Sequence, residues 1–155
     1  MSSVSPTKHP RALRAVLALL ALSALFPGAF ATLAPDAFYR SFPLGGGGWV
    51  APLGPPSAHF TSDVGAFYLA FAFLFAWAAW RPVAALVVPL CLAWGGFSTL
   101  HALWHTFHLE PFSAADAAAQ MVSLVLVLIG PALALVFSRE RPPRWAQPPA
   151  DSQAA

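Results

Sequence analysis

Four long runs of apolar residues, separated by polar or proline-rich segments, set the pattern of this chain. Each run approaches the roughly 20 residues that a helix needs to cross the hydrocarbon core of a bilayer. Backbone polar groups inside lipid must be satisfied within the chain, so runs of this length favour helices. We therefore expect an all-α fold, a four-helix transmembrane bundle. The expected spans are about Ala12–Ala34, Thr61–Trp80, Pro82–His108 and Ser113–Phe137.

The connections between these runs differ in length. The first two runs are separated by Pro35–Phe60, which contains the glycine run Gly45–Gly48 and several prolines and predicts a long outer loop without regular helix. The other two connections are short, so the second, third and fourth helices are expected to be antiparallel neighbours in an up-down-up-down bundle. The terminal segments 1–10 and 139–155 are expected to be disordered and cytoplasmic, which leaves 11–138 as the transmembrane domain.

Composition agrees with a membrane protein. The 155 residues are 58% hydrophobic and 9% charged, whereas soluble domains carry about 25% charged residues. A soluble fold of this size could not bury so much apolar surface, because a small domain leaves much of its surface exposed. The pI is near 9.2, but the net charge is only +2, so the balance of charges does not indicate a nucleic-acid partner.

The basic residues predict the orientation in the membrane. In an up-and-down topology, seven of the eight fall on one side, and only Arg40 falls on the other. The positive-inside rule then places both termini in the cytoplasm of a multi-pass protein of the plasma (inner) membrane. The seven are Lys8, Arg11, Arg14, Arg81, Arg139, Arg141 and Arg144.

A second interpretation of the first apolar run remains open. Its basic start, apolar core and the sequence Ala29-Phe30-Ala31 also resemble a secretory signal peptide with its cleavage site. Cleavage would leave three spans and an extracytoplasmic N-terminus. The sidedness of the remaining helices would be the same in both interpretations.

Histidines gather at the outer end of the third run. His101, His105 and His108 are spaced i, i+4 and i+7, so a helix places them on one face. Ionisable groups within membrane spans are costly and indicate a functional site by default. His59 and Asp63 begin the second run, and Asp116 and Gln120 begin the fourth, at the same predicted depth. Polar residues of three helices are thus expected to converge near the outer face.

Such a cluster could bind a metal ion. His101 and His108 are about 10.5 Å apart along a helix axis, too far to share one ion with ligand distances near 2.0–2.1 Å. The expected site is therefore an adjacent pair, His101/His105 or His105/His108, completed by His59 or Asp63. Zinc, copper, iron or haem would suit imidazole ligands. Two other roles stay open: histidines that only hydrogen-bond between helices, and histidines that transfer protons or bind substrate.

One polar motif has a structural interpretation. Ser113-Ala-Ala-Asp116 has the spacing of a capping box, with Asp in place of the usual Glu. We expect it to begin the fourth helix.

The order of several motifs resembles a known group of proteins. The chain is similar to small actinobacterial four-span integral membrane proteins of unknown function, which are DoxX-like in size and topology. Members usually have an acid before the first histidine, where this chain has Ala58. The resemblance covers most of residues 15–137 and implies the fold and topology but no activity. It is carried by Ala37-Phe-Tyr-Arg-Ser-Phe-Pro43, Trp49, Gly54-Pro55, His59-x3-Asp63-Val-Gly-Ala-Phe-Tyr-Leu69 and His101-x3-His105-x2-His108-Leu109.

Three function hypotheses follow. The first is a membrane protein with a His/Asp site near the outer face that binds a metal ion, haem or a small lipid-like ligand. The second is a non-enzymatic structural or accessory subunit that packs against a membrane partner or a second copy of itself. The third is a small membrane enzyme that uses histidine directly or through a metal. All three share the lipid bilayer as the surrounding phase.

Overall fold

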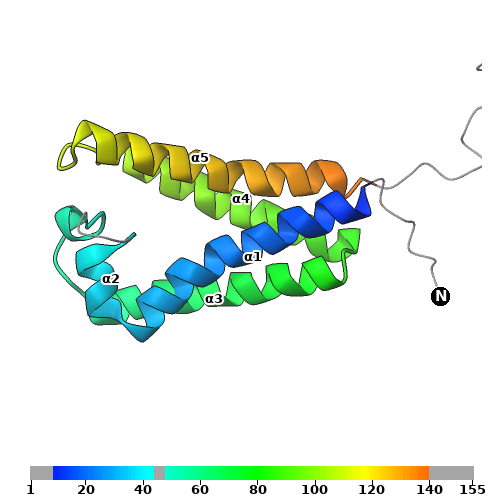
Figure 1. The fold of residues 1–155 in the computed structure, drawn as a ribbon, viewed down its shortest axis with the longest axis horizontal. Helices are drawn as coiled ribbons and strands as arrows, with labels where there is room; N and C mark the ends of the chain where they lie inside the picture. The colour runs from blue at the N-terminus through cyan, green and yellow to red at the C-terminus, as the bar shows by residue number, and fades with distance from the viewer. Residues whose placement is uncertain (1–8, 44–47, 140–155) are drawn as a thin grey trace, which may run out of the picture.

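Four long apolar helices alternate in direction along the chain in the computed structural model, which describes residues 9–43 and 48–139 (Figure 1). The predicted all-α four-helix bundle is confirmed, and the described residues contain no strand. Each of the four long helices is long and apolar enough to cross a membrane. In chain order the elements are α1 (Pro10–Leu33), α2 (Pro35–Ser41), the 3-10 helix η1 (Ala51–Leu53), α3 (Ala58–Trp80), α4 (Ala84–Thr106) and α5 (Ala114–Phe137).

Parts of the predicted loops and ends lie outside the described residues. These are residues 1–8 and 140–155 of the terminal segments, and Gly45–Gly47 of the glycine run. Within the described part, Pro10 already belongs to α1, where proline suits the first helical position.

Serine side chains cap the two helices that begin at the loop-rich end. Ser57 Oγ accepts a hydrogen bond from the Phe60 amide at 3.3 Å, so α3 begins before the predicted Thr61. The Ser113 N-cap of α5 is confirmed, but the reciprocal half of the capping box differs, because Asp116 accepts from the Ser113 hydroxyl and not from its backbone amide. Ser113 Oγ accepts from the Asp116 amide at 3.1 Å and donates to Asp116 Oδ2 at 2.7 Å. The third span is shorter than predicted, since α4 begins at Ala84 and ends at Thr106, before His108.

The predicted loop between the first two spans is partly wrong, because it contains α2 and η1. Pro35 starts α2 instead of preventing it, and Asp36 in its first turn suits the helix dipole. The Tyr39 hydroxyl donates to the Gly54 carbonyl at 2.7 Å. This bond holds the segment after η1 against α2, so the connection between α1 and α3 is a folded unit where the structure describes it.

Glycines bring α1 and α3 close together near the end of α1 and the start of α3. A Cβ at Gly28 would lie 3.0 Å from the Leu69 amide nitrogen, and one at Gly65 would lie 2.7 Å from the Thr32 amide nitrogen. Close backbone approach of this kind is typical of membrane helix pairs. It explains why α3 packs chiefly against α1, and less closely against α4 than the prediction of antiparallel neighbours implies. The prediction holds for α4 and α5, which pack side by side (Figure 1).

Aromatic rings fill the wider space between α3 and α4. Trp94 is 1% exposed and sits among rings of α3. Its ring centroid is 5.3 Å from that of Tyr68, 5.0 Å from that of Phe71 and 5.6 Å from that of Phe75. Offset and edge-to-face contacts at these distances are favourable. Large side chains therefore form the contact between α3 and α4, whereas closely approaching backbones form the contact between α1 and α3.

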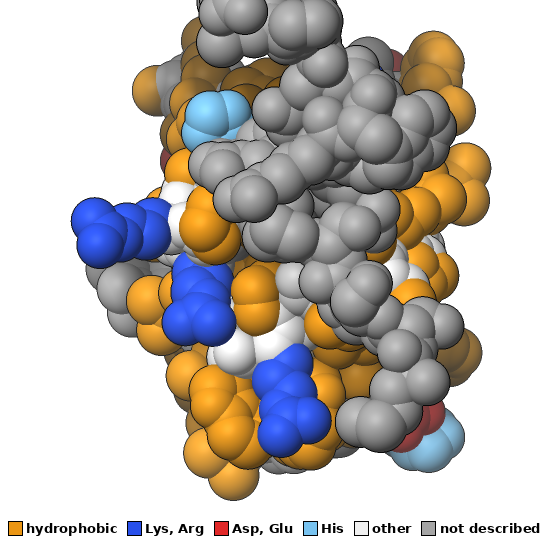
Figure 2. Space-filling model, turned by 90° about the vertical axis from the view of Figure 1, so that its right-hand side faces the viewer, with side chains coloured by type: hydrophobic (Ala, Val, Ile, Leu, Met, Phe, Trp, Pro, Cys, Tyr) orange, Lys and Arg blue, Asp and Glu red, His pale blue; other side chains and the backbone are white. Residues whose placement is uncertain are grey.

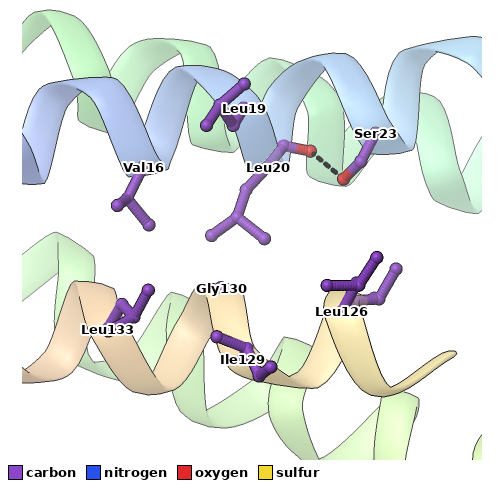
Figure 3. Close-up of a pocket in the computed structure, with 9 residues that line it drawn as sticks. Val16, Leu19, Leu20, Ser23, Leu126, Ile129, Gly130 and Leu133 are labelled. Carbon is purple, nitrogen blue, oxygen red and sulfur yellow. Dashed lines mark hydrogen bonds between the residues drawn. The ribbon is translucent and has the colours of Figure 1, made fainter. Parts of the chain in front are cut away.

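An apolar groove of about 260 Å³ separates α1 from α5 (Figure 3). At the bottom of the groove, Leu20 of α1 packs against Gly130 of α5, where an added Cβ would lie 2.6 Å from Leu20 Cδ2. The Ser23 hydroxyl beside it donates to the Leu20 carbonyl at 2.9 Å within its own helix. The groove is therefore lined almost entirely by apolar side chains.

Charged side chains separate to the two ends of the bundle. Arg11, Arg14, Arg81 and Arg139 lie at the end where α1 begins and α5 ends, and Figure 2 shows basic side chains gathered there. The carboxylates of the described residues all lie at the opposite end, with Arg40: they are Asp36, Asp63, Glu110 and Asp116. Many large apolar side chains between the two ends face outward, including Leu19 at 65% and Leu126 at 62% exposure. The arrangement fits a multi-pass membrane protein.

Candidate functional site

His101 and His105 lie next to each other on the last two turns of α4. Their ring centroids are 4.6 Å apart with an interplanar angle of 80°. The His101 ring stacks on Phe97 at 5.7 Å and 8°, which continues the aromatic packing from Trp94. Both imidazoles are half-buried. The i, i+4 spacing therefore produces the adjacency that the sequence predicts.

Gln120 of α5 faces this pair from the neighbouring helix. Its side chain lies beside that of His105, but no hydrogen bond joins the two. Gln120 is 2% exposed, and its amide oxygen and nitrogen both lack partners among the described residues, as does Nδ1 of His105. Buried polar atoms in proteins are nearly always hydrogen-bonded, and each exception requires an explanation. The two side chains thus offer unused donors and acceptors at one point between α4 and α5.

Two more polar atoms on the same face of α4 lack partners. Ser98 Oγ and Trp94 Nε1 are buried without hydrogen bonds in the described part of the chain. Helical periodicity puts Trp94, Ser98, His101 and His105 within an arc of about 60°. The polar face of α4 therefore extends from the histidine pair toward the middle of the helix. Ser98 is not among the site residues that the sequence predicts.

His108 lies apart from the pair. It follows the end of α4, and its ring stacks on Trp104 at 3.9 Å and 11°. Its Nδ1 is 2.7 Å from the Trp104 carbonyl oxygen, so that nitrogen carries a proton and donates. The side chain is exposed. His108 thus has a local structural role, with one ring nitrogen already engaged.

His59 and Asp63 form a separate pair on α3. His59 Nε2 is 3.4 Å from Asp63 Oδ2, and the side chains are 84% and 63% exposed. Among the described residues, no group of three or more His, Cys, Asp or Glu side chains is close enough to hold one metal ion. The structure therefore contains a half-buried pair on α4 and an exposed pair on α3. Among the described residues, neither His59 nor Asp63 joins the histidine pair as the third ligand that the sequence predicts.

Trp49, which lies between α2 and η1, is hydrogen-bonded to α5 one turn before Gln120. Its Nε1 donates to Asp116 Oδ1 at 3.2 Å, and Asp116 lies one helical turn from Gln120 on the same face. Trp49 also meets Phe42 at 6.5 Å, and its amide donates to the Phe42 carbonyl at 2.8 Å. The sequence predicts Asp116 in the cap of this helix and among the polar residues at this end of the bundle, but not its bond to Trp49. No local signal joins it to Trp49, which lies 67 residues earlier.

Comparison with known proteins adds no function to this geometry. No protein-family model, no curated protein and no solved structure matches the chain.

Proposed function

We propose that this chain is a four-span membrane protein that binds a transition-metal ion through His101 and His105, near the extracytoplasmic face. The observation that carries the proposal is the concentration of unused polar atoms where α4 meets α5. Nδ1 of His105 and both amide atoms of Gln120 are buried there without partners in the described part of the chain.

The chemistry of the pair supports a metal ion. Two histidines at i, i+4 on a helix are a frequent bidentate motif, and imidazole suits zinc, copper, iron and nickel. With ring centroids 4.6 Å apart, one ion can contact a nitrogen of each ring at about 2.0–2.1 Å after a small rotation of the side chains. Two protein ligands leave positions open for water or another molecule, and Gln120 is the nearest group that could hydrogen-bond to it.

The orientation belongs to the same proposal. The end that carries Arg11, Arg14, Arg81 and Arg139 faces the cytoplasm, because cytoplasmic loops carry an excess of Lys and Arg. The histidine pair then faces the outside of the plasma (inner) membrane. Membership of the small actinobacterial, DoxX-like group agrees with this topology and remains part of the proposal.

Titration calorimetry of the detergent-purified protein with Zn²⁺ and Cu²⁺ tests metal binding. We expect one saturable site that is lost in the double variant H101A/H105A and kept in the matched control H59A/H108A, which removes two exposed histidines. Binding that survives H101A/H105A, or that disappears in H59A/H108A, would overturn the assignment. Absence of any binding together with a stoichiometric co-purifying membrane protein would favour the accessory-subunit hypothesis instead.

A further inference from the structure

At the basic end of the bundle, no guanidinium group has a carboxylate partner among residues 9–43 and 48–139. Arg11 and Arg14 lie at the start of α1, Arg81 follows α3 and Arg139 follows α5, and all four side chains are exposed. The one ion pair within the described residues is His59–Asp63, at the other end. Unpaired guanidiniums on a protein surface favour multivalent oxyanions, which they contact in a bidentate manner.

The surroundings of these arginines are apolar and aromatic. The Arg81 guanidinium lies 5.1 Å from the centroid of the Trp80 ring, and Trp80 meets Trp77 edge-to-face at 5.6 Å. Trp80 and Trp77 are 63% and 45% exposed. Exposed tryptophans beside a basic residue at the end of an apolar helix are typical of the membrane–water interface.

Two helix N-termini lie beside the arginines. α1 and α4 both begin at this end, and neither has a side-chain cap or an acidic residue in its first turn. The two helices that begin at the opposite end, α3 and α5, are capped by Ser57 and Ser113. The backbone N–H groups in the first turns of α1 and α4 therefore offer hydrogen-bond donors to an anion beside the arginines, while the C-termini of α3 and α5 at the same end offset the helix dipoles.

We propose that this end binds the headgroups of anionic phospholipids in the adjoining leaflet, with Arg11, Arg14 and Arg81 as the main contacts. A phospholipid matches both halves of the surface, because its phosphate faces the arginines while its acyl chains cover the apolar helix surface below them. A soluble anion would match only the first half.

Nanodiscs allow a direct test, because both of their leaflets have one composition and the direction of insertion does not affect the result. Spin-labelled phosphatidylglycerol or phosphatidylcholine is added to phosphatidylcholine nanodiscs that contain the protein, and the motionally restricted fraction is measured by electron paramagnetic resonance. We expect the native protein to prefer the anionic lipid. Each Arg→Gln change among R11Q, R14Q and R81Q should lower that preference about five-fold, and 1 M NaCl should weaken it.

Two controls decide between charge recognition and damage to the fold. R40Q removes the one arginine described at the opposite end and should leave the preference unchanged. The triple variant R11K/R14K/R81K keeps the charges and should keep most of the preference, even if the glutamine variants are less stable. Equal restriction of both lipids by the native protein, or equal losses in R40Q and R81Q, would overturn the proposal.

Discussion

The indole Nε1 of Trp49 donates a hydrogen bond to Oδ1 of Asp116 at 3.2 Å, across 67 residues of sequence. Within the described residues it is the one hydrogen bond that links the α1–α3 pair to the α4–α5 pair. Other contacts between the pairs include Leu20–Gly130, the rings around Trp94 and the edge-to-face contact of His9 with Phe137. Trp49 thus links the segment between α2 and η1 to α5, the helix that carries Gln120.

Removal of this bond should destabilise the end of the bundle at which α4 ends and α5 begins. We expect W49F and D116A each to lower the midpoint of thermal unfolding in detergent. The double variant should lose less than the two single losses combined, because both remove the same contact. D116A should cost more than W49F, since Asp116 also bonds to the Ser113 hydroxyl. Additive losses would show that the bond does not contribute to stability.

The α1–α3 crossing should tolerate no side chain at Gly65. A Cβ there meets Thr32 Oγ1, the Thr32 amide nitrogen at 2.7 Å and the Gly28 carbonyl oxygen at 2.9 Å. Since two of these atoms are backbone, the helices must separate, and G65A should lower the free energy of unfolding by about 1–3 kcal/mol. Reversible denaturation in mixed micelles measures this quantity.

Gly96 provides the matched control for that experiment. An added Cβ there meets nothing within 4 Å, so G96A should be neutral or slightly stabilising, because alanine loses less backbone entropy in a helix. Similar losses in G65A and G96A would mean that close packing at Gly65 is not what joins α1 to α3.

Trp94 should be the most costly single truncation in the space between α3 and α4. It is 1% exposed and contacts the rings of Tyr68, Phe71 and Phe75. W94A should cost about 3–5 kcal/mol, as aromatic truncations in cores do. W77A, at a 45% exposed tryptophan, should cost far less in the same denaturation assay. Comparable losses of unfolding free energy in W94A and W77A would show that Trp94 is not central to the packing between α3 and α4.

Metal affinity should fall as the pH is lowered. An imidazole must lose its proton to coordinate, so protons compete with the ion once the pH enters the range in which histidine titrates. Above that range the affinity should be constant. Calorimetry of the H59A/H108A protein at several pH values measures the trend without the two exposed histidines. An affinity that does not change on acidification would exclude histidine ligands.

The sequence predicts the parts of this fold that depend on local pattern. The four spans follow from apolar run length, and the Ser113/Asp116 cap follows from its spacing. The short helix α2 escapes prediction because the glycine run and the later prolines dominate the pattern of this segment, although Pro35 at its start is well suited to a first helical turn.

The site is only half predictable for a related reason. The adjacency of His101 and His105 is a property of one helix, and periodicity alone gives it. Which groups of other helices face the pair depends on how each helix is rotated, and that is fixed by non-local packing at Gly28, Gly65 and Trp94. Gln120 therefore meets His105, while His59 and Asp63 pair with each other on the exposed side of α3.

The metal content of protein extracted gently from its own membrane tests the central claim most directly. Elemental analysis of the native protein should find a transition metal in stoichiometric amount, and H101A/H105A prepared in parallel should contain none. Equal metal content in the two preparations, or none in either, would contradict a metal site at the outer end of α4.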